Sequence, residues 1–248
     1  MNSAPKTPST PTHFLLLIWL VLTSLVIFGV AVAVDQGLLQ QMLVADRSQI
    51  CIVVIGMYLL GLGHTFIRTR YISTQVALAE SAVTTLMDAE HVKVSKHQLT
   101  FGEHPVTSGF LHDYLVEELN TQHELTGGTT NLLDAYAAKI RSANEFGWFF
   151  IDLMLKVGFL GTLVGFILML SSVADTGSLD ATTMQKVLKQ MSLGMSTALY
   201  TTLASLVGGI LLSLPYYLLD RGLDHLLQLT VQAKEVLLPT RRVIRTTD

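Results

Sequence analysis

Residues 14–34 read FLLLIWLVLTSLVIFGVAVAV, twenty-one consecutive positions without a charged side chain. A helix of that length rises about 32 Å, which is enough to cross the hydrocarbon core of a bilayer. Three further apolar stretches follow at residues 50–67, at residues 157–174 and at roughly residues 191–219. The chain is therefore predicted to span a membrane four times.

The composition supports a lipid environment. Half of the 248 residues are apolar, the mean hydropathy is +0.49, and only 14% are charged, whereas a soluble domain typically carries about 25%. The formal net charge of −3 argues against a nucleic-acid partner. Cys51 is the only cysteine, so no intramolecular disulfide can form. The predicted fold class is an all-α integral membrane protein whose helices continue as long extensions into the cytoplasm.

The first apolar stretch has an alternative interpretation as a signal peptide. Ala31-Val32-Ala33 resembles the small-residue site at which such peptides are cleaved. However, the apolar run is longer than the usual signal-peptide core, and only Lys6 adds positive charge before it. Length and flanks therefore favour a retained transmembrane helix.

The basic residues predict the orientation. Twelve of the sixteen Lys and Arg residues fall in residues 1–13, 68–146 and 220–248, and three fall in residues 35–49 and 175–190. Because Lys and Arg concentrate on the cytoplasmic side of a membrane, both termini and the large loop are predicted to be cytoplasmic. The two short loops are predicted to face outward.

Five segments follow from this topology. They are a disordered cytoplasmic arm rich in proline (residues 1–13), transmembrane helices 1 and 2 (14–67), a cytoplasmic helical domain (68–146), transmembrane helices 3 and 4 (147–219) and a cytoplasmic tail (220–248).

Helical spacing of apolar residues continues beyond the second span as far as Met87, which predicts that this helix extends out of the membrane. A short helix is predicted around residues 110–119. A further helix, capped by Asn131, is expected to run into span three through an Asp152–Lys156 pair at i,i+4 spacing. No β pattern is evident.

The cores of the four spans carry no Asp, Glu, Lys or Arg. Ion and proton pathways usually use an ionisable group at depth, so a carboxylate would have to come from another chain. His64 lies four residues before Arg68, and a solvated histidine at the membrane interface is favoured there.

Small residues and hydroxyls take the place of charges in spans three and four. At helical spacing, one face of span three holds Gly158, Gly161, Thr162 and Gly165, and one face of span four holds Ala198, Thr202, Ser205 and Gly209, with Thr201 beside it. Such faces let two membrane helices pack closely, which is the favoured reading. The hydroxyls can also line a path for H⁺ or Na⁺, since hydroxyl oxygens are hard ligands.

Enzyme chemistry is not indicated. The chain has no HExxH motif, no GxSxG motif and no paired intramembrane aspartates. The irregular spacing of five loop histidines matches no common metal site; these are His91, His97, His104, His112 and His123. No catalytic or metal-binding residue is therefore predicted.

The sequence GFLGTLVG at residues 158–165, followed by GMSTALYTTL at residues 194–203 and by Pro215, resembles the MotA/TolQ/ExbB family. Its members are channel-forming subunits of ion-driven motors, and the likeness covers roughly residues 155–220. Four spans with a large second cytoplasmic loop resemble the MotA branch, whereas TolQ and ExbB have three spans. Leu155 stands where the family usually has a proline, so the coupled motion is expected to differ.

The resemblance implies a homopentamer in the bacterial inner membrane, built around a dimer of a single-span subunit similar to MotB, TolR or ExbD that carries a transmembrane Asp. Thr162 and Thr202 would face that Asp and line the ion pathway, and Thr201 would contribute if Na⁺ is carried. Pro215 would act as a hinge at the cytoplasmic end of span four. No cofactor is implied beyond the transported H⁺ or Na⁺.

Ion flow would then drive rotation, as in a flagellar stator, and the cytoplasmic domain would contact a rotor or effector protein. Two alternatives stay open at this point. The same channel could energise another envelope machine, as TolQ and ExbB do, or a defence system. The chain could also be a membrane scaffold that conducts no ion, in which the small-residue faces serve packing alone.

Overall fold

The computed structural model describes most of the chain, namely residues 14–46, 48–88, 92–95, 98–101, 104–124, 129–174, 181–237 and 243–245. The proline-rich arm predicted at residues 1–13 lies outside the described residues.

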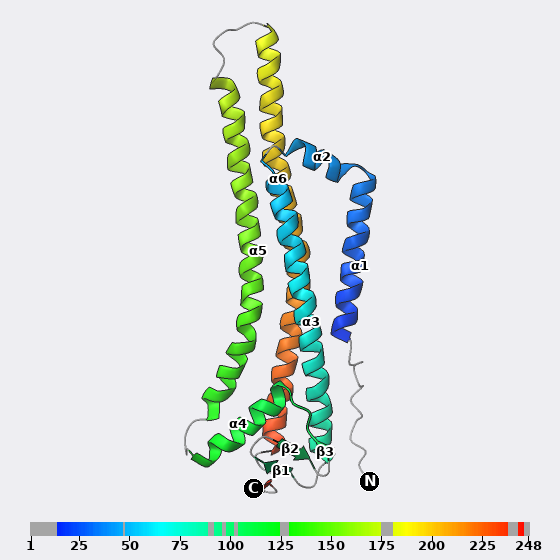
Figure 1. The fold of residues 1–248 in the computed structure, drawn as a ribbon, viewed down its shortest axis with the longest axis vertical. Helices are drawn as coiled ribbons and strands as arrows, with labels where there is room; N and C mark the ends of the chain where they lie inside the picture. Colours follow the sequence, from blue (N-terminus) through cyan, green and yellow to red (C-terminus); the bar gives the residue numbers. More distant parts are fainter. Residues whose placement is uncertain are drawn as a thin grey trace. The chain divides into compact units, whose positions relative to one another are not determined.

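Four of the described helices are long and apolar enough to cross a membrane. They are α1 (Phe14–Asp35), α3 (Ile50–Asp88), α5 (Thr129–Ala174) and α6 (Ala181–Leu237), each drawn as one continuous helix in Figure 1. The predicted all-α membrane class with four spans is confirmed. At 1.5 Å per residue, α3, α5 and α6 are about 58, 69 and 86 Å long, well beyond a core of roughly 30 Å. The predicted helical extensions beyond the spans are therefore present.

One local prediction differs from the structure, and one helix was not predicted. α5 begins at Thr129, so Asn131 lies inside the helix and not at the predicted cap position before it. The connection between α1 and α3 contains a short helix, α2 (Leu38–Ala45), which lies across the direction of its two neighbours (Figure 1). Gly37 turns the chain into α2 with a φ of 72°, a conformation that glycine adopts without steric cost.

The chain divides into two compact units. The first, here called the transmembrane unit, comprises Trp19–Phe66 and Glu145–Tyr217. The second, here called the loop unit, comprises Met1–Ile18, Ile67–Asn144 and Leu218–Asp248, so far as these ranges are described.

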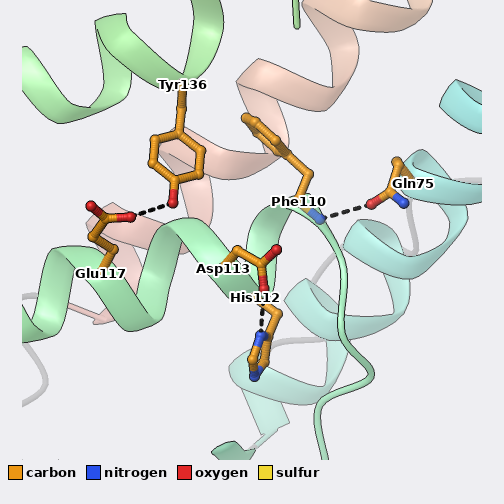
Figure 2. A network of polar contacts seen from close by, with 6 residues as sticks. All are labelled: Gln75, Phe110, His112, Asp113, Glu117 and Tyr136. Carbon is orange, nitrogen blue, oxygen red and sulfur yellow. Dashed lines mark hydrogen bonds and ion pairs between the residues drawn. The ribbon is translucent and has the colours of Figure 1, made fainter. Parts of the chain in front are cut away.

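In the loop unit, the predicted short helix is present as α4 (Phe110–Glu124). Figure 2 shows how its neighbours hold it: the backbone N–H of Phe110 donates to Gln75 of α3 over 2.8 Å, and Tyr136 of α5 donates to Glu117. His112 and Asp113 interact within α4 at 3.1 Å. Polar contacts thus tie α4 to two of the long helices.

The last part of α6 contacts α4 through a buried ion pair. Lys234 Nζ lies 3.0 Å from Glu118 Oε1, and the Glu118 side chain is only 2% exposed. The hydroxyl of Tyr114 donates to the other carboxylate oxygen over 3.4 Å. Burial raises the pKa of the Tyr114 hydroxyl, which therefore stays a neutral hydrogen-bond donor.

A small sheet completes the loop unit, and the sequence reading missed it. Strands β1 (Val92–Ser95), β2 (Gln98–Phe101), β3 (His104–Pro105) and β4 (Val243–Arg245) lie in the order β3-β2-β1-β4. Neighbours pair antiparallel, except that β4 runs parallel to β1. Strands of two to four residues are too short to show a clear alternation of apolar and polar residues. The parallel partner also comes from the far end of the chain.

Candidate ion pathway and helix interface

Helices α5 and α6 approach each other closely along three glycines of α5. A methyl group added at Gly158 would lie 1.8 Å from Ser205 Oγ, and one added at Gly161 would lie 2.5 Å from Thr201 Oγ1. At Gly165 it would meet backbone atoms of α6, at 2.7 Å from both the Ala198 nitrogen and the Gly194 oxygen. No larger residue fits at these positions without moving a helix. We call this row of contacts the α5–α6 interface.

Two hydroxyls are enclosed in the α5–α6 interface. Thr201 is fully buried, and Ser205 is 1% exposed. Thr201 donates to the carbonyl oxygens of Thr197 and Ala198, both at 3.0 Å, and Ser205 donates to that of Thr202 at 3.0 Å. Each hydroxyl is thus satisfied by its own helix, as is common for Ser and Thr in membrane helices.

The other two predicted pathway threonines lie at the edge of this interface. Thr162 and Thr202 are both partly exposed on this chain. Thr162 donates to the carbonyl oxygen of Phe159 over 2.6 Å, and Thr202 donates to that of Ala198 over 3.0 Å. The structure therefore separates the three threonines: one is enclosed between α5 and α6, and two are accessible from outside the chain.

Gly209 and Pro215 have different surroundings from the rest of the predicted set. A methyl group at Gly209 would lie 3.0 Å from Leu155 Cδ2, so this glycine faces a large side chain. Pro215 is buried inside α6. Gly209 thus continues the contact of α6 with α5, but the two helices approach less closely there than at the three glycines of α5.

Sequence reasoning missed a polar cluster where α2 meets α3 and α6. The hydroxyl of Thr197, fully buried, donates to the carbonyl oxygen of Ala45 over 2.8 Å. The next residue, Asp46, accepts hydrogen bonds from the Ser48 hydroxyl at 2.6 Å and from the Cys51 N–H at 2.7 Å. An Asp shortly before an apolar run is a typical helix cap, so this sequence signal could have located Asp46.

The carboxyl of Asp46 is the buried acidic group of this cluster. Burial acts to raise its pKa, but the hydrogen bonds from Ser48 and Cys51 outweigh that effect and hold the pKa below its ordinary value. Asp46 is therefore a charged cap for the first turn of α3. Among the described residues, no group of three or more His, Cys, Asp or Glu side chains could hold a metal ion.

The model of one protein family, described as the MotA/TolQ/ExbB proton channel family, matches residues 107–231. This range is half of the chain and contains α4, α5 and most of α6. The chain belongs to the MotA/TolQ/ExbB proton channel family. A search of the curated proteins finds no match.

Family membership assigns a broad function to the geometry. Proteins of the MotA/TolQ/ExbB family are membrane channel proteins and generally work with a single-span partner subunit. Together with the four apolar helices, the match identifies a multi-pass membrane protein of a channel-forming family. The matched range contains every residue of the α5–α6 interface, as well as Thr162, Thr202 and Pro215.

Proposed function

We propose that the chain is the channel-forming subunit of an ion-driven rotary motor similar to a flagellar stator. Five copies surround two copies of a single-span partner that carries a transmembrane aspartate. The chain lies in the bacterial inner membrane with both termini and the loop unit in the cytoplasm, where the loop unit contacts a rotor or effector protein. The family match over α4, α5 and α6 carries this proposal.

Thr162 and Thr202 face the partner aspartate and line the ion pathway. Their partial exposure on a single chain supports this role, since a side chain of another subunit can reach them. The absence of Asp and Glu from the apolar cores of the spans supports a carboxylate supplied by the partner. Thr201 is enclosed against Gly161, so it reaches a transported Na⁺ only if α5 and α6 separate there.

Pro215 acts as the hinge of α6. A proline inside a helix removes one backbone hydrogen bond, which makes bending easier at that position. Ion binding and release at the aspartate would bend α6 there, and the pentamer would step around the anchored dimer.

The first test is the native mass of the complex purified after co-expression with the product of the neighbouring gene. A mass that fits five copies and two partners supports the proposal, and the outward domain of the partner then shows which machine is powered. A cell-wall-binding domain would indicate a flagellar stator, whereas another envelope domain would indicate a TolQ/ExbB-like role. A monomer, or an assembly that needs no partner, would overturn the motor mechanism.

Ion flux through the complex in liposomes, under H⁺ or Na⁺ gradients, tests the threonines. Thr162→Ala and Thr202→Ala should keep the assembled mass and lower the flux about tenfold, since each removes one oxygen ligand. Ser171→Ala is the matched control, because Ser171 is exposed on α5 and its hydroxyl, like that of Thr162, donates to a carbonyl of its own helix. Loss of assembly in both threonine variants would favour a scaffold that conducts no ion.

A further inference from the structure

The proline of α6 leaves a weak point in an otherwise continuous helix. Pro215 has no N–H, so the carbonyl oxygen of Leu211, four residues earlier, receives no helical hydrogen bond from it. The backbone alone therefore does not fix the direction of the segment that follows. Contacts of the neighbouring side chains must do so, and the next residue, Tyr216, makes them.

Tyr216 is enclosed by α5. Tyr216 is 1% exposed. A methyl group added at Gly147 would lie 2.0 Å from Cε1 of the Tyr216 ring, so the ring fills the space beside this glycine. The ring centroid of Trp148 lies 6.4 Å away. Gly147 therefore provides a slot for the Tyr216 ring, and no larger residue can occupy this position of α5 while the ring stays in place.

α3 contacts α6 on both sides of Pro215. A methyl group on Gly61 would lie 2.5 Å from Leu212 Cδ2, before the proline. After it, His64 Nδ1 lies 2.7 Å from the Tyr216 hydroxyl, and the two atoms share one hydrogen bond whichever of them carries the proton. The His64 ring also meets Phe146 edge to face, with centroids 5.9 Å apart.

This environment differs from the one that the sequence favours for His64, which is a solvated position at the membrane interface. The imidazole is partly buried and bonded to a side chain that is itself buried. In an apolar environment a polar group has few alternative partners, so such a bond is retained unless another polar group replaces it. The bond thus links α3 to the residue that directly follows the proline.

We propose that His64 is a positioning residue that, through its hydrogen bond to Tyr216, fixes the direction of α6 after Pro215. This inference rests on the proposed motor function, because it assigns His64 to the hinge of that motor. Ion flux then depends on the hydrogen-bonding capacity of His64 and not on its size or charge. Loss of the bond lets the segment after the proline take other directions and lowers the fraction of complexes in the conducting arrangement.

For the test, each variant is assembled with the single-span partner and placed in liposomes. The ion flux per assembled complex is then compared among the variants. His64→Leu and Tyr216→Phe should each lower the flux about fivefold, the factor expected for one lost hydrogen bond. The double variant should be no worse than either single variant, because both remove the same bond. His64→Asn should retain wild-type flux, because its amide oxygen can take the place of Nδ1 as acceptor.

A neighbouring substitution serves as the control. A methyl group at Gly63 meets nothing within 4 Å. Gly63→Ala should therefore keep wild-type flux. Hydrogen exchange of residues 211–222 provides a second readout, and it should be faster in His64→Leu but not in His64→Asn.

Equal losses in His64→Asn and His64→Leu, or additive losses in the double variant, would overturn the inference. If the wild-type complex carries no ion at all, the proposed motor function fails instead. Hydrogen exchange then decides the positioning role by itself, and identical exchange in wild type and His64→Leu would refute it.

Discussion

In the loop unit, charged and polar side chains reach from one long helix to another, whereas in the transmembrane unit glycines of α5 lie against small side chains of α6. Arg141 of α5 lies 3.1 Å from Asp224 of α6, and His225 of α6 lies 3.2 Å from Glu80 of α3. Along α5, Gly158, Gly161 and Gly165 instead lie directly against α6.

The difference follows from the solvent of each region. Lipid tails are as apolar as leucine, so membrane helices gain little from burying large apolar side chains and instead approach closely through small residues. Outside the lipid, burial of apolar surface stabilises the fold, and ion pairs can add specificity between neighbouring helices. Tyr114, Leu115 and Leu119 of α4 are buried in this way beside the Glu118–Lys234 pair.

The largest expected effect concerns the buried ion pair of the loop unit. Lys234→Met leaves the carboxylate of Glu118 buried without its ammonium partner, so the free energy of unfolding should fall by about 3–5 kcal/mol. Unfolding of the purified protein by titration with a denaturing detergent measures this change.

The exposed pair provides the comparison. Arg141 and Asp224 are 54% and 61% exposed, so Arg141→Ala should cost less than about 1 kcal/mol. Equal losses of unfolding free energy in Lys234→Met and Arg141→Ala would show that burial does not determine how much these pairs stabilise the fold.

A smaller effect is expected at the α5–α6 interface. Gly165→Ala places a methyl group against backbone atoms of α6, which cannot rotate away, and should lower the free energy of unfolding by about 1–3 kcal/mol. Gly56→Ala in α3 is the matched control, because a methyl group there meets nothing within 4 Å. A neutral Gly165→Ala would mean that the two helices do not pack as closely as the structure indicates.

The smallest effect concerns the cap of α3. Asp46→Ala should cost about 1 kcal/mol, whereas Asp46→Asn, which also accepts hydrogen bonds at a cap, should cost a few tenths. Because the pKa of Asp46 is lowered in the folded protein, its charge stabilises the fold above the unfolded pKa of about 4. That contribution disappears as the pH falls through the lowered pKa.

Thermal unfolding of wild type and Asp46→Asn at pH 7 and pH 3 checks the sign of this pH dependence. The stability of the wild type relative to Asp46→Asn should be smaller at pH 3 than at pH 7. An advantage that grows on acidification would contradict a lowered pKa.

Much of the fold follows from local sequence. The four spans, the continuation of α3 and α5 beyond them and the Asp152–Lys156 pair at 2.6 Å all depend on residues within a few turns of each other. Hydrophobic length and helical periodicity express such local relations directly. The same periodicity places Gly158, Gly161 and Gly165 on one face of α5.

Tertiary structure decided which residues from distant segments meet. Helical spacing groups the threonines by face, but only the rotation of α6 against α5 encloses Thr201 and leaves Thr162 and Thr202 partly exposed. The parallel pairing of β1 with β4, the bond between His64 and Tyr216 and the ion pair between Glu118 and Lys234 join residues more than a hundred positions apart. Periodicity within one segment holds no information about the partner of that segment, because the partner is set by how the helices cross and how the strands align.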